Sequence, residues 1–190
     1  MAEQPEQRIA VIGSPGAGKS TLATLIAEAT GLPLIHLDRE YWRPGWVEPD
    51  ADEWQAANAR LIAGEAWVID GNYGSSLAAR AKRATVIVWF DLPTRVCLLG
   101  VVRRALRYRG AVRPDMREGC PERLDGEFVR FLHYIVMFRR RKRPALAAEL
   151  VRSAKPVVRI GSTAERARFA QVVAAEGAQG IVRLASATGK

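Results

Sequence analysis

A lysine, a serine and three glycines stand together in one stretch near the N-terminus, and these residue types in combination can bind phosphate. The stretch consists of Gly13, Ser14, Pro15, Gly16, Ala17, Gly18, Lys19 and Ser20. It matches the pattern G-x-x-x-x-G-K-[ST], whose backbone N–H groups surround phosphate oxygens at the N-terminus of a helix. We predict that Lys19 contacts the β and γ phosphates of a nucleoside triphosphate and that Ser20, followed by Thr21, contributes an oxygen to Mg²⁺.

The surroundings of this phosphate loop, residues 13–20, favour nucleotide binding over an ordinary glycine-rich turn. The apolar run 9–12 predicts a buried strand before the loop, and residues 20–30 predict a helix after it, which is the context that the pattern needs. The sequence lacks the Asn-Lys-x-Asp tetrad with which GTPases bind guanine, since its only asparagines are Asn58 and Asn72. We therefore expect ATP and Mg²⁺ as cofactors.

Apolar runs and helical patterns alternate along the chain, which is typical of an α/β fold with a parallel sheet covered by helices on both faces. We predict strands at 8–12, 34–37, 67–70, 85–90 and 156–160. Helices are predicted at 20–30, 52–63, 76–82, 94–107, 126–138, 144–153 and 163–176, with a frayed tail at 185–190. Ligands of such folds bind outside the carboxyl ends of the strands, so we expect functional residues there.

Three carboxylates follow predicted strands. Asp70 has the form of the acidic residue that orients Mg²⁺ or its water, and Gly71 lets the chain turn away closely. Asp38 is either a base that takes a proton from an acceptor hydroxyl or a loop residue. Asp91 precedes Leu92-Pro93-Thr94, and for this residue we favour a place at the start of the next helix.

The segment after Asp38 is rich in aromatic residues, with Tyr41, Trp42 and Trp46 close together. These rings either stack on a base or an apolar acceptor face, or form a small core beneath a surface segment. The remaining tryptophans, which we interpret as structural, are Trp54, Trp67 and Trp89. His36 and His133 have no ligand partner at a useful spacing, so we expect no metal site at either histidine.

Composition predicts one globular domain over residues 1–190, with 48% apolar residues. No run of eighteen or more apolar residues occurs, and the first residues lack the basic and apolar regions of a signal peptide, so we expect a cytoplasmic protein with no membrane partner. The two cysteines, Cys97 and Cys120, are expected to be free thiols.

Positive charge is concentrated in residues 103–143, the basic segment. It contains thirteen Arg or Lys against five Asp or Glu, a net charge of +8, whereas the whole chain carries +9. The candidates for gripping phosphoryl oxygens are Arg103, Arg104, Arg113 and the run 139–143. Most of these cations are expected to form a solvated face, and a nucleic-acid backbone is the alternative partner.

Four motifs together resemble the DNA topology-modulation (FlaR-related) proteins, which are similar in turn to adenylate kinase and other small-molecule P-loop kinases. The motifs are the phosphate loop, Leu37-Asp38 with Tyr41-Trp42-x-Pro44-Gly45-Trp46, Ile69-Asp70-Gly71-Asn72-Tyr73, and Arg113-Pro-Asp-Met-x-Glu-Gly-Cys-Pro-Glu-Arg123. The resemblance covers roughly residues 8–175 and implies a three-layer P-loop NTPase fold with strand order 2-3-1-4-5. It also implies an acceptor-binding segment at about 38–64 and a lid at about 103–143.

The resemblance has informative departures. Adenylate kinases continue Asp-Gly with Phe-Pro-Arg, whereas this chain continues with Asn72-Tyr73-Gly74, so the arginine that would hold an acceptor phosphate is missing and AMP is doubtful as acceptor. Arg80 is the candidate substitute. Gly100 stands where a lid-entry arginine is expected, which leaves Arg103 and Arg104 for that role.

Together these observations predict an ATP-dependent small-molecule kinase, either monomeric or homodimeric. The expected catalytic residues are Lys19, Asp38, Arg103, Arg104 and Arg113, and the expected Mg²⁺ ligands are Ser20 and Asp70. The expected acceptor-binding residues are Asp38, Tyr41, Trp42, Trp46, Asp70, Gly71, Asn72, Tyr73 and Arg80. The alternative function is a nucleotide-gated nucleic-acid-binding protein that uses the basic segment.

Overall fold

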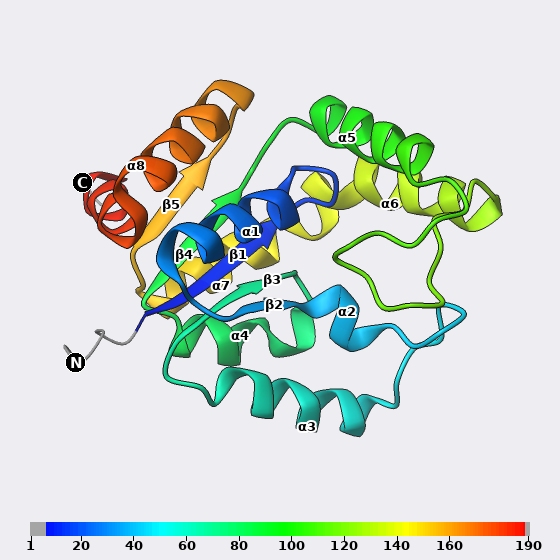
Figure 1. The fold of residues 1–190 in the computed structure, drawn as a ribbon, viewed down its shortest axis with the longest axis horizontal. Coiled ribbons are helices and arrows are strands. Elements are labelled where there is room, and N and C mark those ends of the chain that lie inside the picture. The colour runs from blue at the N-terminus through cyan, green and yellow to red at the C-terminus, as the bar shows by residue number, and fades with distance from the viewer. Residues whose placement is uncertain (1–6, 189–190) are drawn as a thin grey trace.

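Five parallel strands form one sheet in the order β2-β3-β1-β4-β5 in the computed structural model, which describes residues 7–188 (Figure 1). The strands are β1 (Arg8–Gly13), β2 (Leu34–His36), β3 (Trp67–Asp70), β4 (Val86–Phe90) and β5 (Val157–Ile160). In register, Val11 of β1 lies opposite Asp70 of β3 and Val88 of β4. The predicted α/β fold and strand order are confirmed.

Helices cover both faces of this sheet. They are α1 (Lys19–Thr30), α2 (Leu37–Tyr41), α3 (Ala51–Ile62), α4 (Gly74–Arg83), α5 (Thr94–Arg107), α6 (Gly126–Arg141), α7 (Arg143–Ser153) and α8 (Thr163–Thr188). Helices α1 and α8 pack together on one face, while α3, α4 and α7 lie on the other (Figure 1). Helices α5 and α6 pack against each other, and their connection extends toward α2 beside the carboxyl ends of the strands (Figure 1).

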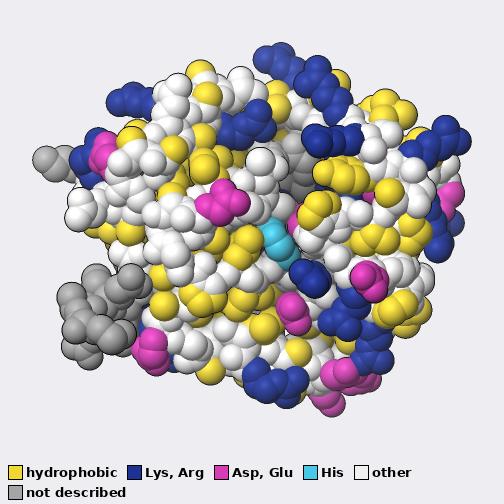
Figure 2. Space-filling model, in the orientation of Figure 1, with side chains coloured by type: hydrophobic (Ala, Val, Ile, Leu, Met, Phe, Trp, Pro, Cys, Tyr) yellow, Lys and Arg dark blue, Asp and Glu magenta, His cyan; other side chains and the backbone are white. Residues whose placement is uncertain are grey.

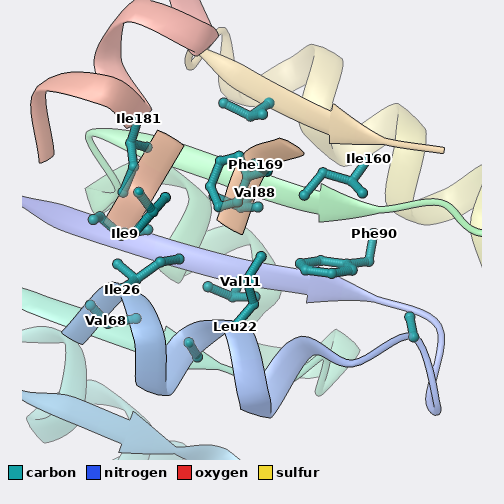
Figure 3. Close-up of a cluster of buried hydrophobic side chains, with 14 of the residues drawn as sticks. Ile9, Val11, Leu22, Ile26, Val68, Val88, Phe90, Ile160, Phe169 and Ile181 are labelled. Atoms are coloured by element: carbon teal, nitrogen blue, oxygen red, sulfur yellow. The ribbon is translucent and has the colours of Figure 1, made fainter. Parts of the chain in front are cut away.

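The central strand β1 divides its side chains between two cores, because successive residues of a strand point to opposite faces. Ile9 and Val11 belong to the core beneath α1 and α8, and Figure 3 shows them beside Leu22 and Ile26 of α1. Ala10 and Ile12 belong to the opposite core, with α3, α4 and α7. Burial on both faces explains why β1 is apolar at almost every position.

Two helical regions differ from the prediction. The short helix α2 occupies residues that we expected partly as strand and partly as loop, and it contains Asp38. Helix α8 continues past Gly177, whose φ of 55° marks a kink within it, and reaches Thr188. Ile181 and Ala185 are buried against the core, so the predicted frayed tail is wrong for residues 185–188, whereas 189–190 lie outside the described residues.

Asp91, directly after β4, is a buried ion-pair centre rather than the start of α5. Its carboxylate accepts two hydrogen bonds from Arg143 at 2.7 Å each, and two from Arg159 at 3.0 and 2.6 Å. Both guanidinium groups also lie over the Trp89 ring. The cap position of α5 is Pro93, so the prediction that Asp91 begins that helix is wrong. Asp91 instead connects the start of α7 to β4 and β5.

Three further expectations can be compared with the described residues. No helix within residues 7–188 is both long and apolar enough to cross a membrane. Cys97 and Cys120 are free thiols, as predicted, and both are buried. Trp54, Trp67 and Trp89 are buried in the core beside α3, α4 and α7, which confirms that they are structural.

Replacing Asp91 with asparagine should destabilise the fold in a pH-dependent way. Burial raises the pKa of Asp91, but the hydrogen bonds from Arg143 and Arg159 outweigh burial and hold the pKa below its ordinary value. We expect Asp91→Asn to lower the free energy of unfolding by about 1–3 kcal/mol at pH 7. Because the folded-state pKa is depressed, this difference should be fully present above about pH 4 and shrink as the pH falls further.

Urea unfolding of both proteins across pH 3 to 7 would measure this difference. Glu118→Gln is the matched control, because Glu118 is an exposed carboxylate in the loop between α5 and α6. Equal stability of wild type and Asp91→Asn at pH 7 would contradict the structural role of Asp91.

Candidate functional site

The phosphate loop leaves the sheet at the end of β1 and enters α1. Gly13 has a φ of 133°, and Gly18, which caps α1, has a φ of 88°, both in the region that favours glycine. Lys19 Nζ donates a hydrogen bond to the Ser14 carbonyl oxygen at 3.1 Å, so the ammonium lies along its own loop. The backbone N–H groups at the start of α1 and this ammonium form a positively charged cradle.

A continuous cleft of about 2030 Å³ opens at the carboxyl edge of the sheet. In Figure 2, acidic and basic side chains are interspersed around the hollowed middle of this face. The predicted site residues that line the cleft are Pro15, Gly16, Gly18, Lys19, Ser20, Thr21, Asp38, Trp42, Trp46, Asp70, Gly71, Asn72, Tyr73, Arg103, Arg104 and Arg113. The structure therefore brings the phosphate loop, the predicted carboxylates Asp38 and Asp70, and three predicted arginines around one space. Gly13, Ser14 and Ala17 are buried in the loop behind it.

Asp70, the last residue of β3, faces His36, the last residue of β2. Asp70 Oδ2 lies 3.2 Å from His36 Nδ1, so His36 does have an acidic neighbour, which the sequence analysis missed. The other carboxylate oxygen, Oδ1, is buried without a hydrogen-bond partner among the described residues.

Asp70 and Ser20 fit Mg²⁺ chemically. An unsatisfied buried carboxylate oxygen and a serine hydroxyl are hard oxygen donors in the same cleft. No three His, Cys, Asp or Glu side chains in residues 7–188 converge as a metal site. Mg²⁺ takes one or two protein oxygens beside substrate phosphates and retains water for the remaining positions, and Asp70 and Ser20 are the residues that would hold it.

Asp38, on α2, is held by Tyr73 from the turn after β3. Tyr73 donates its hydroxyl proton to Asp38 Oδ1 at 2.8 Å. Burial and then the nearby charge of Asp38 raise the pKa of Tyr73 far above its ordinary value, so the phenol stays protonated. Asp38 is therefore a partly buried carboxylate with one oxygen already hydrogen-bonded.

Asn72 contacts the phosphate loop. Its side-chain oxygen accepts from the Gly13 N–H at 2.9 Å, and its side-chain nitrogen donates to the Gly13 carbonyl at 2.7 Å. Asn72 also lines the cleft, so its predicted place in the acceptor site stays a prediction.

Arg80 lies beneath the turn rather than in the cleft. Its side chain is fully buried, and it donates hydrogen bonds to the carbonyls of Gly71 and Asn72. Burial lowers the pKa of Arg80 to about 10, which still leaves the guanidinium charged at neutral pH. In this position Arg80 supports the turn and cannot replace the missing arginine of the adenylate kinases, so we leave it out of the acceptor site.

The aromatic residues after Asp38 divide between the two alternatives raised by the sequence. Trp42 and Trp46 line the cleft and contact each other edge to face, with ring centroids 5.4 Å apart. Tyr41 packs instead against Trp54 and Tyr73, with centroids 5.0 and 4.6 Å away. The segment thus contributes two rings to the cleft and one to the core behind it.

The predicted arginines of the basic segment are not equally available to a ligand. Arg104 Nε and Arg113 Nε lie 3.1 and 2.7 Å from Oε1 of the buried Glu122. Both contacts are ion pairs, because their angles lie outside hydrogen-bond geometry. Arg113 also pairs with Asp115 at 2.9 Å. Burial, then repulsion from Arg113, lowers the pKa of Arg104. Arg103 also lines the cleft, and no hydrogen bond or ion pair engages it within residues 7–188.

Most of the run 139–143 lies away from the cleft. Arg143 pairs with Asp91, and Arg139 donates to the Leu92 carbonyl, while Lys142 alone of the run lines the cleft. The expectation that this run grips phosphoryl groups is therefore not supported for Arg139 and Arg143, because their guanidinium groups are engaged elsewhere.

The acceptor segment and the basic segment are joined by a clasp, which we define as residues 39–46 and 117–121. The Gly45 N–H donates to the Gly119 carbonyl at 2.8 Å, and Trp46 Nε1 donates to the Pro121 carbonyl at 3.0 Å. Two further bonds at 3.1 Å run from Cys120 Sγ to the Arg43 carbonyl and from Arg117 Nε to the Arg39 carbonyl. The clasp borders the cleft through Arg39, Trp42, Gly45 and Trp46, which line it.

One cleft position escaped the sequence analysis. Arg166, in the first turn of α8, lines the cleft and donates to the Ala17 carbonyl at 3.2 Å. The Ser162-x-x-Glu165 capping pattern could have located that turn, since the Glu165 N–H donates to Ser162 Oγ at 3.1 Å.

Gly100, which the sequence placed where a lid-entry arginine is expected, lies against the phosphate loop. A Cβ there would overlap the Gly16 carbonyl, which explains why no arginine stands at the expected lid entry.

Two solved structures are similar to this chain over nearly its whole length. A gluconokinase from Sinorhizobium meliloti 1021 shares 20% sequence identity, with 98% of this chain and 97% of that chain covered and a TM-score of 0.52. A shikimate kinase from Acinetobacter baumannii, in complex with shikimate, shares 16% identity over 97% and 96% of the two chains, with a TM-score of 0.55. No protein-family model and no curated protein matches the sequence. The chain therefore shares its overall fold with these two kinases.

Replacing Gly100 with alanine tests the close contact between α5 and the phosphate loop. The added methyl group has no space beside Gly16, so we expect the free energy of unfolding to fall by about 1–3 kcal/mol. Gly126→Ala is the matched control, because a Cβ at this first residue of α6 meets nothing within 4 Å and should change stability by no more than about 0.5 kcal/mol. Urea unfolding measures both, and equal effects would contradict the proposed contact.

Proposed function

We propose that this protein is an ATP-dependent phosphotransferase that moves the γ-phosphate of ATP to a hydroxyl of a small molecule. The observation that carries the proposal is one cleft containing both Lys19 in its phosphate loop and Asp38 in its hydrogen bond with Tyr73. The phosphate loop with Lys19 can bind the phosphate donor, and the Asp38 carboxylate can receive the proton of the hydroxyl that accepts the phosphate.

The donor half of the cleft suits a nucleoside triphosphate. Backbone N–H groups of the phosphate loop and the Lys19 ammonium bind phosphate oxygens, while Arg166 adds a cation on the α8 side. Ser20 and Asp70 would hold Mg²⁺, which when bound neutralises charge on the phosphates. ATP is the proposed donor because the chain lacks the guanine-binding tetrad of GTPases.

The chemical step needs little covalent help from the protein. As the acceptor oxygen bonds to the γ-phosphorus, its proton passes to Asp38, the bond between that phosphorus and the β–γ bridging oxygen breaks, and ADP leaves. Arg103, a cleft arginine without an ion pair among the described residues, is proposed to stabilise the charge on the transferring group.

The acceptor is proposed to be a small hydroxylated molecule that binds between α2 and the basic segment. Trp42 and Trp46 provide apolar surface there, and Arg103 and Arg123 line the same space without ion pairs among the described residues, which favours an acceptor with an anionic group. Gluconate and shikimate therefore head the screen, because the two similar kinases are named for these hydroxy acids. Within this class, the motifs at 37–46, 69–73 and 113–123 lead us to propose a relationship to the FlaR-related proteins.

Nucleotide binding can be measured by calorimetry with magnesium and ATP. We expect the wild-type protein to release heat on titration, and Lys19→Ala to weaken the affinity by tenfold or more, because a charge-assisted contact to phosphate contributes about 1.5–3 kcal/mol. Lys82→Ala, which removes a lysine outside the cleft, should bind as wild type does. Absence of heat with folded wild-type protein would overturn the proposal.

Asp38→Asn tests the proposed base. We expect the affinity for ATP to be preserved. The rate of acceptor-dependent ADP formation should fall about a hundredfold or more, because the variant lacks the carboxylate that takes the proton. Glu48→Gln, which alters another cleft carboxylate, is the control and should retain most activity. Unchanged turnover in Asp38→Asn would mean that Asp38 is part of the scaffold.

Nucleic-acid binding is the second candidate, favoured by the exposed side chains of Arg140, Arg141 and Lys142 around the end of α6. Such cations bind a phosphate backbone without sequence preference, and the affinity falls steeply with salt. A screen in which no acceptor stimulates ADP formation, combined with salt-sensitive duplex binding, would favour this candidate over the kinase.

A further inference from the structure

We infer that Asn72 and Tyr73 are positioning residues that place the phosphate donor and the proton acceptor relative to each other. The inference rests on the proposed function and deepens it. The two residues stand next to each other in the turn formed by residues 70–73, yet one contacts Gly13 of the phosphate loop and the other contacts Asp38 of the acceptor segment. One short turn therefore connects both halves of the reaction.

Asn72 extends the sheet beyond the end of β3. Between β1 and the end of β3, the last backbone hydrogen bond runs from the Gly71 N–H to the Val11 carbonyl at 3.1 Å. The chain then turns away from β1. The Asn72 side-chain amide then takes the place of a backbone peptide, because it accepts from the Gly13 N–H and donates to the Gly13 carbonyl. An aspartate could accept but not donate, so the amide is the group that satisfies both sides of Gly13.

Tyr73 fixes one oxygen of Asp38. Its hydroxyl bonds to Asp38 Oδ1, which leaves Oδ2 to receive the proton of the acceptor. The ring itself is held by aromatic neighbours, with centroids 4.6 Å from Tyr41 and 5.0 Å from Trp54. The backbone of Tyr73 has a φ of 33°, a conformation that non-glycine residues adopt rarely and that directs the ring toward α2.

Arg80 and Leu37 hold the turn formed by residues 70–73 in place, so the positions of Asn72 and Tyr73 are fixed relative to each other. Arg80 donates to the carbonyls of Gly71 and Asn72, as well as to Ser76 Oγ. A Cβ at Gly71 would lie 2.8 Å from the Leu37 Cβ, which leaves no space for the turn to shift toward α2. These contacts leave Asn72 and Tyr73 with little freedom independent of the sheet.

The two residues should have separable effects on binding and turnover. We expect Asn72→Ala to raise the Kd for magnesium ATP about tenfold or more, because the phosphate loop loses both bonds to Gly13. Asn72→Asp should weaken binding further, since it also places a negative charge beside the phosphates. Tyr73→Phe should leave this Kd unchanged and lower kcat about tenfold, the loss expected when a charged carboxylate loses one hydrogen bond. Tyr41→Phe, which keeps the neighbouring ring, is the control for Tyr73.

Calorimetry with magnesium ATP measures the Kd, and release of ADP measures kcat, with the best acceptor from the screen or with water if none is found. Thermal unfolding checks that each variant is folded. Asn72→Gln, which keeps the amide but adds one methylene group to the side chain, is a further variant at that position. Wild-type protein that binds no ATP would refute the proposed function itself. This inference would be overturned, while the kinase proposal stands, if the wild-type protein binds magnesium ATP and the folded Asn72 variants bind it with the same Kd. A Tyr73→Phe protein with wild-type kcat would overturn it too.

Discussion

A buried peptide group at Gly13 governs how the site is arranged. Gly13 ends β1 and pairs with Phe90 of β4 on one side, but β3 has already ended at Asp70 on the other. A backbone N–H or carbonyl buried without a partner costs free energy comparable to a lost hydrogen bond. The Asn72 amide satisfies both groups, and this requirement fixes the turn that also carries Asp70 and Tyr73.

The parts of the protein that could be predicted from sequence are those in which neighbouring residues suffice. A buried parallel strand is apolar at successive positions, and the phosphate loop is contiguous, so both were evident before the structure. The role of Asn72 could not be predicted in this way, because its hydrogen-bond partner Gly13 lies 59 residues away in the sequence. Asp91 was assigned to a helix start for the same reason, since its partners Arg143 and Arg159 are 52 and 68 residues distant.

Charge counting identified the basic segment but not its use. Glu122 engages Arg104 and Arg113, and Asp91 engages Arg143, so much of the excess charge serves internal ion pairs. A count along the sequence cannot distinguish a cation that is paired inside the fold from one that faces a ligand. Arg103 and Arg104 are neighbours on the same helix and both line the cleft, but within residues 7–188 only Arg104 forms an ion pair.

The clasp between 39–46 and 117–121 has a consequence for how this protein can diverge. Every acceptor in its four hydrogen bonds is a main-chain carbonyl, so the acceptor side of each bond does not depend on residue type. Three of the four donors, however, are the side chains of Trp46, Cys120 and Arg117, so the connection between the two segments depends on the residue types at these positions. Because the Trp46 indole both lines the cleft and bonds the two segments to each other, a substitution there would alter the wall of the cleft and the connection between the segments together.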